Sequence, residues 1–335
     1  MVDLKLLDLA TDFAWKFQGL TYPNPAVGAL ICDELGRVIS IEAHKRAGSP
    51  HAEVEVLKSA YFKITNDDKI LQLQNSSEIH SYLENNHNNI FKNCTIYVTL
   101  EPCNHFGKTP PCSHLLAKMK FKRVVIGSLE CNKDASGGAE FLRQNGIRVD
   151  LLENSKCKAL IEPFNLWQRD GFVFFKLAMS LNGVVDGGVI TSKESRELVH
   201  KLRDRCDLLV IGGNTVRVDR PTLDARMTGG KAPDILIYSK REDFDRSMPL
   251  FSIPNRKVFI SNSLELTKKY KFIMIEGAEG MLKATTKIVN HYLIFRSPNF
   301  KTGNHPNLNL KLKELYSQKI GKDRFGWFKR SHLKH

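Results

Sequence analysis

Thr99-Leu100-Glu101-Pro102-Cys103 lies at the end of one expected strand. Cys112 follows after eight intervening residues and opens the next expected helix. An earlier stretch, Pro50-His51-Ala52-Glu53, also opens a helix. One His and two Cys side chains bind Zn²⁺ tetrahedrally and leave the fourth position to water, as catalytic zinc sites require. The exposed N–H groups of two helix N-termini would also stabilise the thiolates. The pattern therefore predicts a Zn²⁺ site made by His51, Cys103 and Cys112.

Glu53 lies two residues beyond the expected histidine ligand. Zinc lowers the pKa of its bound water toward about 7. A carboxylate beside that water can take its proton and deliver it to a ring nitrogen and then to departing ammonia. His-x-Glu combined with Pro-Cys is the signature of zinc deaminases of nucleobases. The sequence thus predicts Glu53 as the catalytic proton carrier of a deaminase.

Two other interpretations of the same pattern stay open. A purely structural zinc site usually has four protein ligands, and His105 or His114 could supply the fourth. A zinc-stabilised binding protein without catalysis would use such a site. A nucleic-acid base deaminase of the tRNA type, with a basic accessory domain, would use the same chemistry on a flipped-out base.

The patterns around these motifs predict alternating strands and helices. A hairpin is expected over residues 26–32 and 37–43, with strands over 94–100, 123–129 and 147–152. Helices are expected near the N-terminus and over 51–60, 113–120 and 139–145. Such alternation predicts a largely parallel sheet covered by helices. The polar, Asn-rich residues 61–92 are expected to form a surface insertion without chemistry of its own.

The length of 335 residues predicts two domains, since domains usually hold about 100–200 residues. We place them at 1–152 and 170–335. The second is expected to open with a strand at 172–181, followed by a helix capped by Thr191 and Glu194. Further strands are expected at 207–212, 234–238, 257–260, 272–275, 291–295, 312–318 and 325–329, with a helix from about residue 280.

Charge and cysteine content limit the partners and the compartment. Residues 1–150 hold 17 basic and 17 acidic residues, so the net charge of +14 lies in the remainder. A basic half suits phosphate-bearing small molecules or nucleic acid. Seven cysteines, an odd number, favour a reducing cytoplasm. No stretch approaches the roughly 20 apolar residues of a membrane span. Neither a nucleic-acid nor a membrane partner is expected, and a homo-oligomer remains open.

The first half resembles the deaminase domain of the bifunctional riboflavin-biosynthesis deaminase–reductase family. The resemblance is carried by the eight-residue cysteine spacing and by Pro23-Asn24-Pro25-Ala26-Val27-Gly28, His44-Lys45-Arg46-Ala47-Gly48, and Asn132 with Gly137-Gly138. It implies a cytidine-deaminase-like three-layer α/β/α fold. The implied substrate is a phosphorylated diaminopyrimidine. Asn24 would bind the edge of the pyrimidine, and Lys108 would help to meet the phosphate.

The second half is similar to the reductase domain of the same family. The matching segments are 176–183, 213–226 and 275–280, whereas Asn182-Gly183 and the short segment 186–190 depart from the family pattern. The resemblance implies a dihydrofolate-reductase-like α/β fold that transfers hydride from NADPH to the ribosyl chain. The implied cofactor-binding residues are Met179, Thr215, Asp219, Ala278, Glu279 and Gly280. The implied substrate-binding residues are Lys176, Arg203, Leu223, Arg226 and Glu276.

Overall fold

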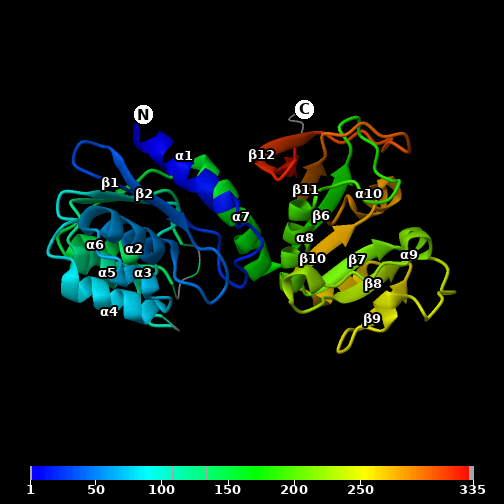
Figure 1. The fold of residues 1–335 in the computed structure, drawn as a ribbon, viewed down its shortest axis with the longest axis horizontal. Coiled ribbons are helices and arrows are strands. Elements are labelled where there is room, and N and C mark those ends of the chain that lie inside the picture. The colour runs from blue at the N-terminus through cyan, green and yellow to red at the C-terminus, as the bar shows by residue number, and fades with distance from the viewer. Residues whose placement is uncertain (1, 108, 131, 133–134, 332–335) are drawn as a thin grey trace. The chain divides into compact units, whose positions relative to one another are not determined.

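The computed structural model describes residues 2–107, 109–130, 132 and 135–331. The chain divides into two compact units, Met1–Asn165 and Leu166–His335 (Figure 1). Lys108 and Cys131 lie outside the described residues. None of the described helices is long and apolar enough to cross a membrane.

Unit 1 is built on a five-stranded sheet of order β2-β1-β3-β4-β5. β1 pairs antiparallel with β2 and β3, whereas β3, β4 and β5 run parallel. The strands are β1 (Gly28–Cys32), β2 (Val38–Ala43), β3 (Thr95–Val98), β4 (Arg123–Ile126) and β5 (Arg148–Leu151). The expected hairpin and the parallel strands are confirmed.

Helices cover both faces of this sheet, which gives the expected three-layer α/β/α architecture. Leu7 and Ala10 of α1 pack with Leu30 of the sheet and with Cys157 of α7 on one face. The other helices lie together on the opposite side (Figure 1). The helices of unit 1 are α1 (Val2–Trp15), α2 (Ala52–Thr65), α3 (Lys69–Gln72), α4 (Ser76–Asn86), α5 (Cys112–Met119), α6 (Gly138–Gln144) and α7 (Ser155–Arg169).

The prediction of a surface insertion over residues 61–92 is wrong in part, because the segment forms α3 and α4. Asn75 caps α4 by accepting a hydrogen bond from Ser77 N. Ile79 and Leu83, one turn apart on α4, are fully buried, and α4 packs against α2 and α5. The Asn residues lie mainly at the two ends of α4 and just beyond it, whereas its apolar side is buried.

The residues between the two expected domains, 153–169, are mostly helical. α7 occupies residues 155–169, and the two compact units meet within it, after Asn165. Asn154 caps its first turn, since its side-chain oxygen accepts from the backbone N–H groups of Lys156 and Cys157. The apolar side of α7 packs on the first sheet through Cys157.

Unit 2 contains an eight-stranded sheet of order β12-β13-β11-β6-β10-β7-β8-β9. The strands from β11 to β9 in this order run parallel, and β13 and β12 add antiparallel strands at one edge. The strands are β6 (Phe172–Met179), β7 (Leu208–Gly212), β8 (Asp234–Tyr238), β9 (Val258–Ser261), β10 (Phe272–Glu276), β11 (His291–Arg296), β12 (Leu312–Ile320) and β13 (Asp323–Arg330). All of the expected strands of this half are present.

The helices of unit 2 include two features that differ from expectation. Ser192, not Thr191, caps α8, because its side chain accepts from Ser195 N. The buried Asp323 of β13 supports this turn by accepting from Ser192 N and from the Ser195 hydroxyl. The short helix α9 was not expected. The helices are α8 (Lys193–Arg205), α9 (Gly213–Asp219) and α10 (Glu279–Thr285), with 3₁₀ turns η1 (Arg226–Thr228), η2 (Pro249–Phe251) and η3 (Glu265–Lys269).

Truncation of Leu83 tests whether the insertion is part of the core of unit 1. We expect Leu83→Ala to lower the free energy of unfolding by about 3 kcal/mol, because a fully buried leucine loses its transfer energy and leaves a cavity. Leu71→Ala, at a partly exposed leucine of α3, serves as the control and should cost less than about 1 kcal/mol. Urea titrations measure both. Equal, small effects would mean that α4 contributes nothing to the stability of the core.

Candidate active sites

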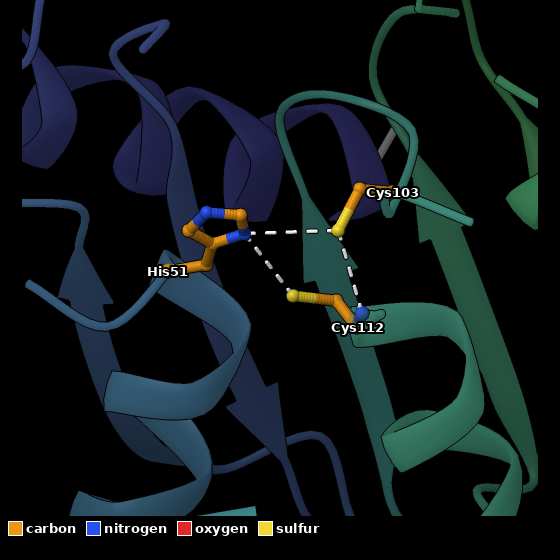
Figure 2. A group of neighbouring side chains, drawn as sticks. All are labelled: His51, Cys103 and Cys112. Carbon is orange, nitrogen blue, oxygen red and sulfur yellow. Dashed lines mark hydrogen bonds between the residues drawn. The ribbon is translucent and has the colours of Figure 1, made fainter. Parts of the chain in front are cut away.

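The three expected zinc ligands converge on one point in unit 1 (Figure 2). His51 caps the start of α2, Cys103 follows β3, and Cys112 is the first residue of α5. His51 Nδ1 lies 3.7 Å from Cys103 Sγ and 3.4 Å from Cys112 Sγ. A tetrahedral zinc ion with normal bond lengths holds a nitrogen and a sulfur about 3.6 Å apart. The donor atoms are therefore spaced as zinc requires.

The pKa values of Cys103 and Cys112 also suit a site that binds a cation. A hydrogen bond from the Cys112 side chain lowers the pKa of Cys103. The hydrogen bonds from His51 and from the backbone N–H of Cys112 act in the same direction. The same hydrogen bond between the two side chains, together with burial, raises the pKa of Cys112. Two adjacent buried thiolates repel each other, so a divalent cation is what allows both to lose their protons.

Described residues of unit 1 offer no fourth His, Cys, Asp or Glu to this group. His105 is exposed, and His114 stacks on Phe141 with ring centroids 4.2 Å apart. The alternative of a structural site completed by either histidine therefore loses its ligand. A three-ligand site leaves a position for water, as a catalytic zinc site does.

Glu53 lies beside the ligands in the first turn of α2 and is only 4% exposed. Burial raises the pKa of its carboxyl to about 7, and the charge of Cys103 acts in the same direction. A carboxyl with a pKa near neutrality can both accept and return a proton. Its placement suits the role that the sequence assigns to it.

Asn24 is oriented by His44, a histidine for which no role was predicted. His44 Nδ1 lies 2.9 Å from the carbonyl oxygen of Pro50, and its Nε2 lies 3.1 Å from Asn24 Nδ2. Burial lowers the pKa of His44 to about 4, so the ring is neutral at pH 7. Because a carbonyl only accepts, Nδ1 carries the proton and Nε2 accepts from the amide of Asn24. The remaining amide acceptor, Oδ1, is then left for a ligand.

Glu101 holds the loop that carries Cys103. Its buried carboxylate accepts from the backbone N–H groups of Gly137, Ala139 and Glu130. Gly138 sits so close that a Cβ there would lie 1.9 Å from the carbonyl oxygen of Pro102. Glu101 and Gly138 therefore fix the position of the ligand Cys103 and do not themselves bind the metal.

His80 is a further residue that the sequence did not single out. It comes from α4 and is 4% exposed, and its Nε2 is buried without a hydrogen-bond partner in the described chain. Burial lowers its pKa to about 4. A histidine within an Asn-rich segment carries no local sequence signal, because only the packing of α4 on α2 and α5 buries it.

A second cluster, in unit 2, joins three of the expected substrate residues. Lys176 of β6 lies opposite Glu276 of β10 in the parallel register, and its Nζ is 3.4 Å from Glu276 Oε2. Arg203 of α8 donates to Glu276 Oε1 from Nε at 2.9 Å and from Nη2 at 2.7 Å. Burial would raise the pKa of Glu276, but the charges of Arg203 and Lys176 outweigh it and hold the pKa at about 2.

Leu223 and Arg226 lie on the segment that borders this cluster. Arg203 Nη1 donates to the carbonyl oxygen of Asp224 at 3.4 Å, and Arg226 Nη1 lies 2.7 Å from Asp224 Oδ1. Leu223 is buried, whereas Arg226 is exposed. Arg203 is thus already paired with protein groups through three of its five N–H donors.

The expected cofactor residues lie after neighbouring strands. Met179 ends β6, Thr215 and Asp219 belong to α9 after β7, and Ala278, Glu279 and Gly280 follow β10. β6, β10 and β7 are adjacent and parallel, so these positions lie together at the carboxyl ends of the strands. Ligands of open α/β sheets bind at these strand ends. A Cβ at Gly280 would meet nothing within 4 Å, which leaves its backbone open to a ligand. The Glu279 side chain instead accepts from Asn307 N at 2.9 Å.

The sequence comparisons define the class of protein. Residues 1–128 match the cytidine and deoxycytidylate deaminase zinc-binding region, and residues 171–322 match the RibD C-terminal domain. The chain is therefore an enzyme that joins a zinc-dependent deaminase to a reductase. A nucleic-acid deaminase with a basic accessory domain is not favoured, because the second half matches this C-terminal domain.

Two relatives identify the family to which the chain belongs. The riboflavin biosynthesis protein RibD of Aquifex aeolicus is 36% identical over 324 residues, which cover 94% of this chain and 78% of that protein. RibD of Synechocystis is 33% identical over 234 residues, covering 67% of this chain and 56% of that protein. The chain belongs to the RibD family of riboflavin biosynthesis proteins.

Solved structures show the same fold. A diaminohydroxyphosphoribosylaminopyrimidine deaminase/5-amino-6-(5-phosphoribosylamino)uracil reductase from Thermotoga maritima has a TM-score of 0.64 at 24% identity, over 98% of this chain and 99% of that chain. RibD of Acinetobacter baumannii has a TM-score of 0.63 at 22% identity, over 99% of each chain. At these identities the likeness concerns the fold alone.

The ion cluster of unit 2 predicts a stability that depends on pH. A carboxyl whose pKa is lowered by folding stabilises the protein above its unfolded pKa, here 4.5, and loses that contribution as the pH falls toward 2. Glu276→Gln should therefore lower the free energy of unfolding by about 3 kcal/mol at pH 7, because two buried cations lose their partner. The gap to the unsubstituted chain should shrink below about pH 4.5.

Urea titrations from pH 7 to pH 3 measure that gap. Glu265→Gln is the matched control, since Glu265 pairs with Lys268 at the exposed surface and should change stability by less than about 1 kcal/mol. A constant gap across this pH range would contradict the assigned ionisation of Glu276.

Proposed function

We propose that unit 1 hydrolytically deaminates 2,5-diamino-6-ribosylamino-4(3H)-pyrimidinone 5′-phosphate. We propose that unit 2 then reduces the ribosyl group with NADPH to give 5-amino-6-(5-phosphoribitylamino)uracil. The main support for the deaminase reaction is the group of three donor residues, His51, Cys103 and Cys112, beside the buried Glu53. Membership of the RibD family supports the pairing of the two reactions.

In the deaminase reaction, water replaces an exocyclic amino group and ammonia leaves. His51, Cys103 and Cys112 would hold zinc, which supplies Lewis acidity that makes water nucleophilic at neutral pH. Glu53 takes a proton from the attacking water and gives it to the ring nitrogen. It then takes the proton of the newly added hydroxyl group and delivers it to the amino group, so that the carbonyl forms and ammonia leaves. Asn24 Oδ1, left free by the bond from Nδ2 to His44, accepts a hydrogen bond from the edge of the pyrimidine.

In the reductase reaction, NADPH supplies the hydride that reaches C1 of the ribose. Met179, Thr215, Asp219 and the backbone of Ala278, Glu279 and Gly280 would hold this cofactor along the shared strand edge. Lys176 and Glu276 contact the reacting sugar. Leu223, Arg203 and Arg226 bind the rest of the ribosyl phosphate, for which a guanidinium is suited because it binds phosphate bidentately.

We also infer that the enzyme works in the cytoplasm, takes a phosphorylated pyrimidine and has no nucleic-acid or membrane partner. The cysteines of the described chain are free thiols, in keeping with a reducing compartment. The positive charge of the second half suits a substrate and a cofactor that both carry phosphate.

Removal of the Glu53 carboxylate separates proton transfer from metal binding. We expect Glu53→Gln to reduce deamination by about 10²- to 10⁴-fold, the usual contribution of a general acid–base. Zinc content should stay unchanged, because Glu53 is not one of the three ligands. Supplying the diaminopyrimidine ribosyl phosphate and following ammonia release gives the rate, and metal analysis gives the zinc content.

Two controls accompany this measurement. Glu55→Gln changes a neighbouring carboxylate of α2 that pairs with Lys45, and should leave ammonia release unchanged. Reduction of separately supplied deaminated product, followed as NADPH oxidation, should continue in Glu53→Gln. A normal deamination rate in Glu53→Gln would show that the proton carrier is another group.

A further inference from the structure

Arg256 is a half-buried cation that is held by backbone oxygens instead of a carboxylate. Its Nε donates to the carbonyl of Pro233 at 2.9 Å, its Nη1 to that of Thr222 at 2.7 Å, and its Nη2 to that of Leu223. Nη1 also lies 3.5 Å from the carbonyl of Leu250. No carboxylate within the described chain forms an ion pair with Arg256, and its burial lowers its pKa to about 10.

These oxygens belong to segments that are far apart in the sequence. Thr222 and Leu223 follow α9, Pro233 precedes β8, and Leu250 lies in η2. Residues 220–225 have no regular secondary structure to satisfy their carbonyl groups. A planar guanidinium with five donors can bind several carbonyls at fixed angles, which the compact ammonium of lysine cannot do.

The segment that Arg256 holds leads directly into the ion cluster of unit 2. Leu223 has a φ of 56°, in the left-handed region that L-residues with bulky side chains rarely adopt. The next residue, Asp224, accepts from Arg203 through its carbonyl and from Arg226 through its carboxylate. The bonds from Arg256 to Thr222 and Leu223 therefore stabilise the turn that sets the positions of Asp224 and Arg226.

We propose that Arg256 is a positioning residue of the reductase, which fixes residues 222–226 in the conformation that binds the phosphorylated end of the substrate. The proposal rests on the reductase function proposed above. Arg256 acts through the backbone of Thr222 and Leu223 and does not touch the reacting atoms. Its effect falls on the substrate and not on NADPH, because Arg256 bonds to Thr222 and Leu223 and to none of the expected cofactor residues.

The kinetic test compares Arg256→Lys and Arg256→Met in the full chain. Loss of two or more charge-assisted hydrogen bonds should raise KM for the ribosylaminopyrimidine phosphate on the order of tenfold in Arg256→Lys. Arg256→Met, which lacks the charge as well, should raise it further. KM for NADPH should stay within about twofold of the unsubstituted value, because the cofactor edge is not held by Arg256.

Arg246→Lys is the matched control, since Arg246 is an exposed arginine of the same region that lies over the ring of Phe251. It should leave both KM values unchanged. An unchanged substrate KM in Arg256→Lys would overturn the proposal, and so would a parallel rise in KM for NADPH, which indicates general loosening. If Arg256→Met does not fold, Arg256→Lys decides alone.

Limited proteolysis separates this proposal from the proposed function. Trypsin can cut after Arg226 and Lys231, and mass spectrometry follows both cleavages in the folded chain. We expect faster cleavage at these sites in Arg256→Lys than in the unsubstituted chain or Arg246→Lys. Equal cleavage rates would refute the positioning role even if the reductase is active. Absence of reduction by the unsubstituted chain would instead refute the proposed function.

Discussion

The deaminase site depends on the convergence of two helix N-termini and one strand end on a single point. His51 begins α2, Cys112 begins α5, and Cys103 follows β3. Backbone N–H groups at a helix start are free to face an anion, and that of Cys112 does so, lying 3.4 Å from Cys103 Sγ. The sheet and the two helix starts thus bring the three donor atoms within 4.8 Å of one another.

The surroundings of this point serve mainly to keep it rigid. Glu101 binds three backbone N–H groups around residues 130–139, and Asn104 N donates to the carbonyl of Ala135. His44 links Asn24 to Pro50, the residue before the histidine ligand. Asn24, the proposed pyrimidine-binding residue, and His51 are thereby tied to the same short piece of backbone. This suits the requirement that reacting groups be held within a fraction of an ångström.

The sequence predicted the metal site and the positions of the strands better than the supporting contacts. A metal restricts its ligands to a few residue types at strand ends and helix starts, so His51, Cys103 and Cys112 stand out as a pattern. Arg256 could not be found in this way, because its partners are backbone carbonyls that any residue could supply. For α4 a signal was present: Asn75 is an N-cap, and Ile79 and Leu83 are four residues apart. The Asn-rich composition outweighed it.

The two buried carboxyl groups show that neighbouring charges decide whether burial raises the pKa of an acid. Glu53 and Glu276 are both less than a tenth exposed. Burial, together with the charge of Cys103, raises the pKa of Glu53 to about 7, so that it can exchange a proton. Between Arg203 and Lys176, the pKa of Glu276 falls to about 2, so that it stays charged. A carboxylate with so low a pKa is a poor proton carrier at neutral pH but a permanent anchor for cations. In this state Glu276 holds Lys176 and Arg203 together by its charge.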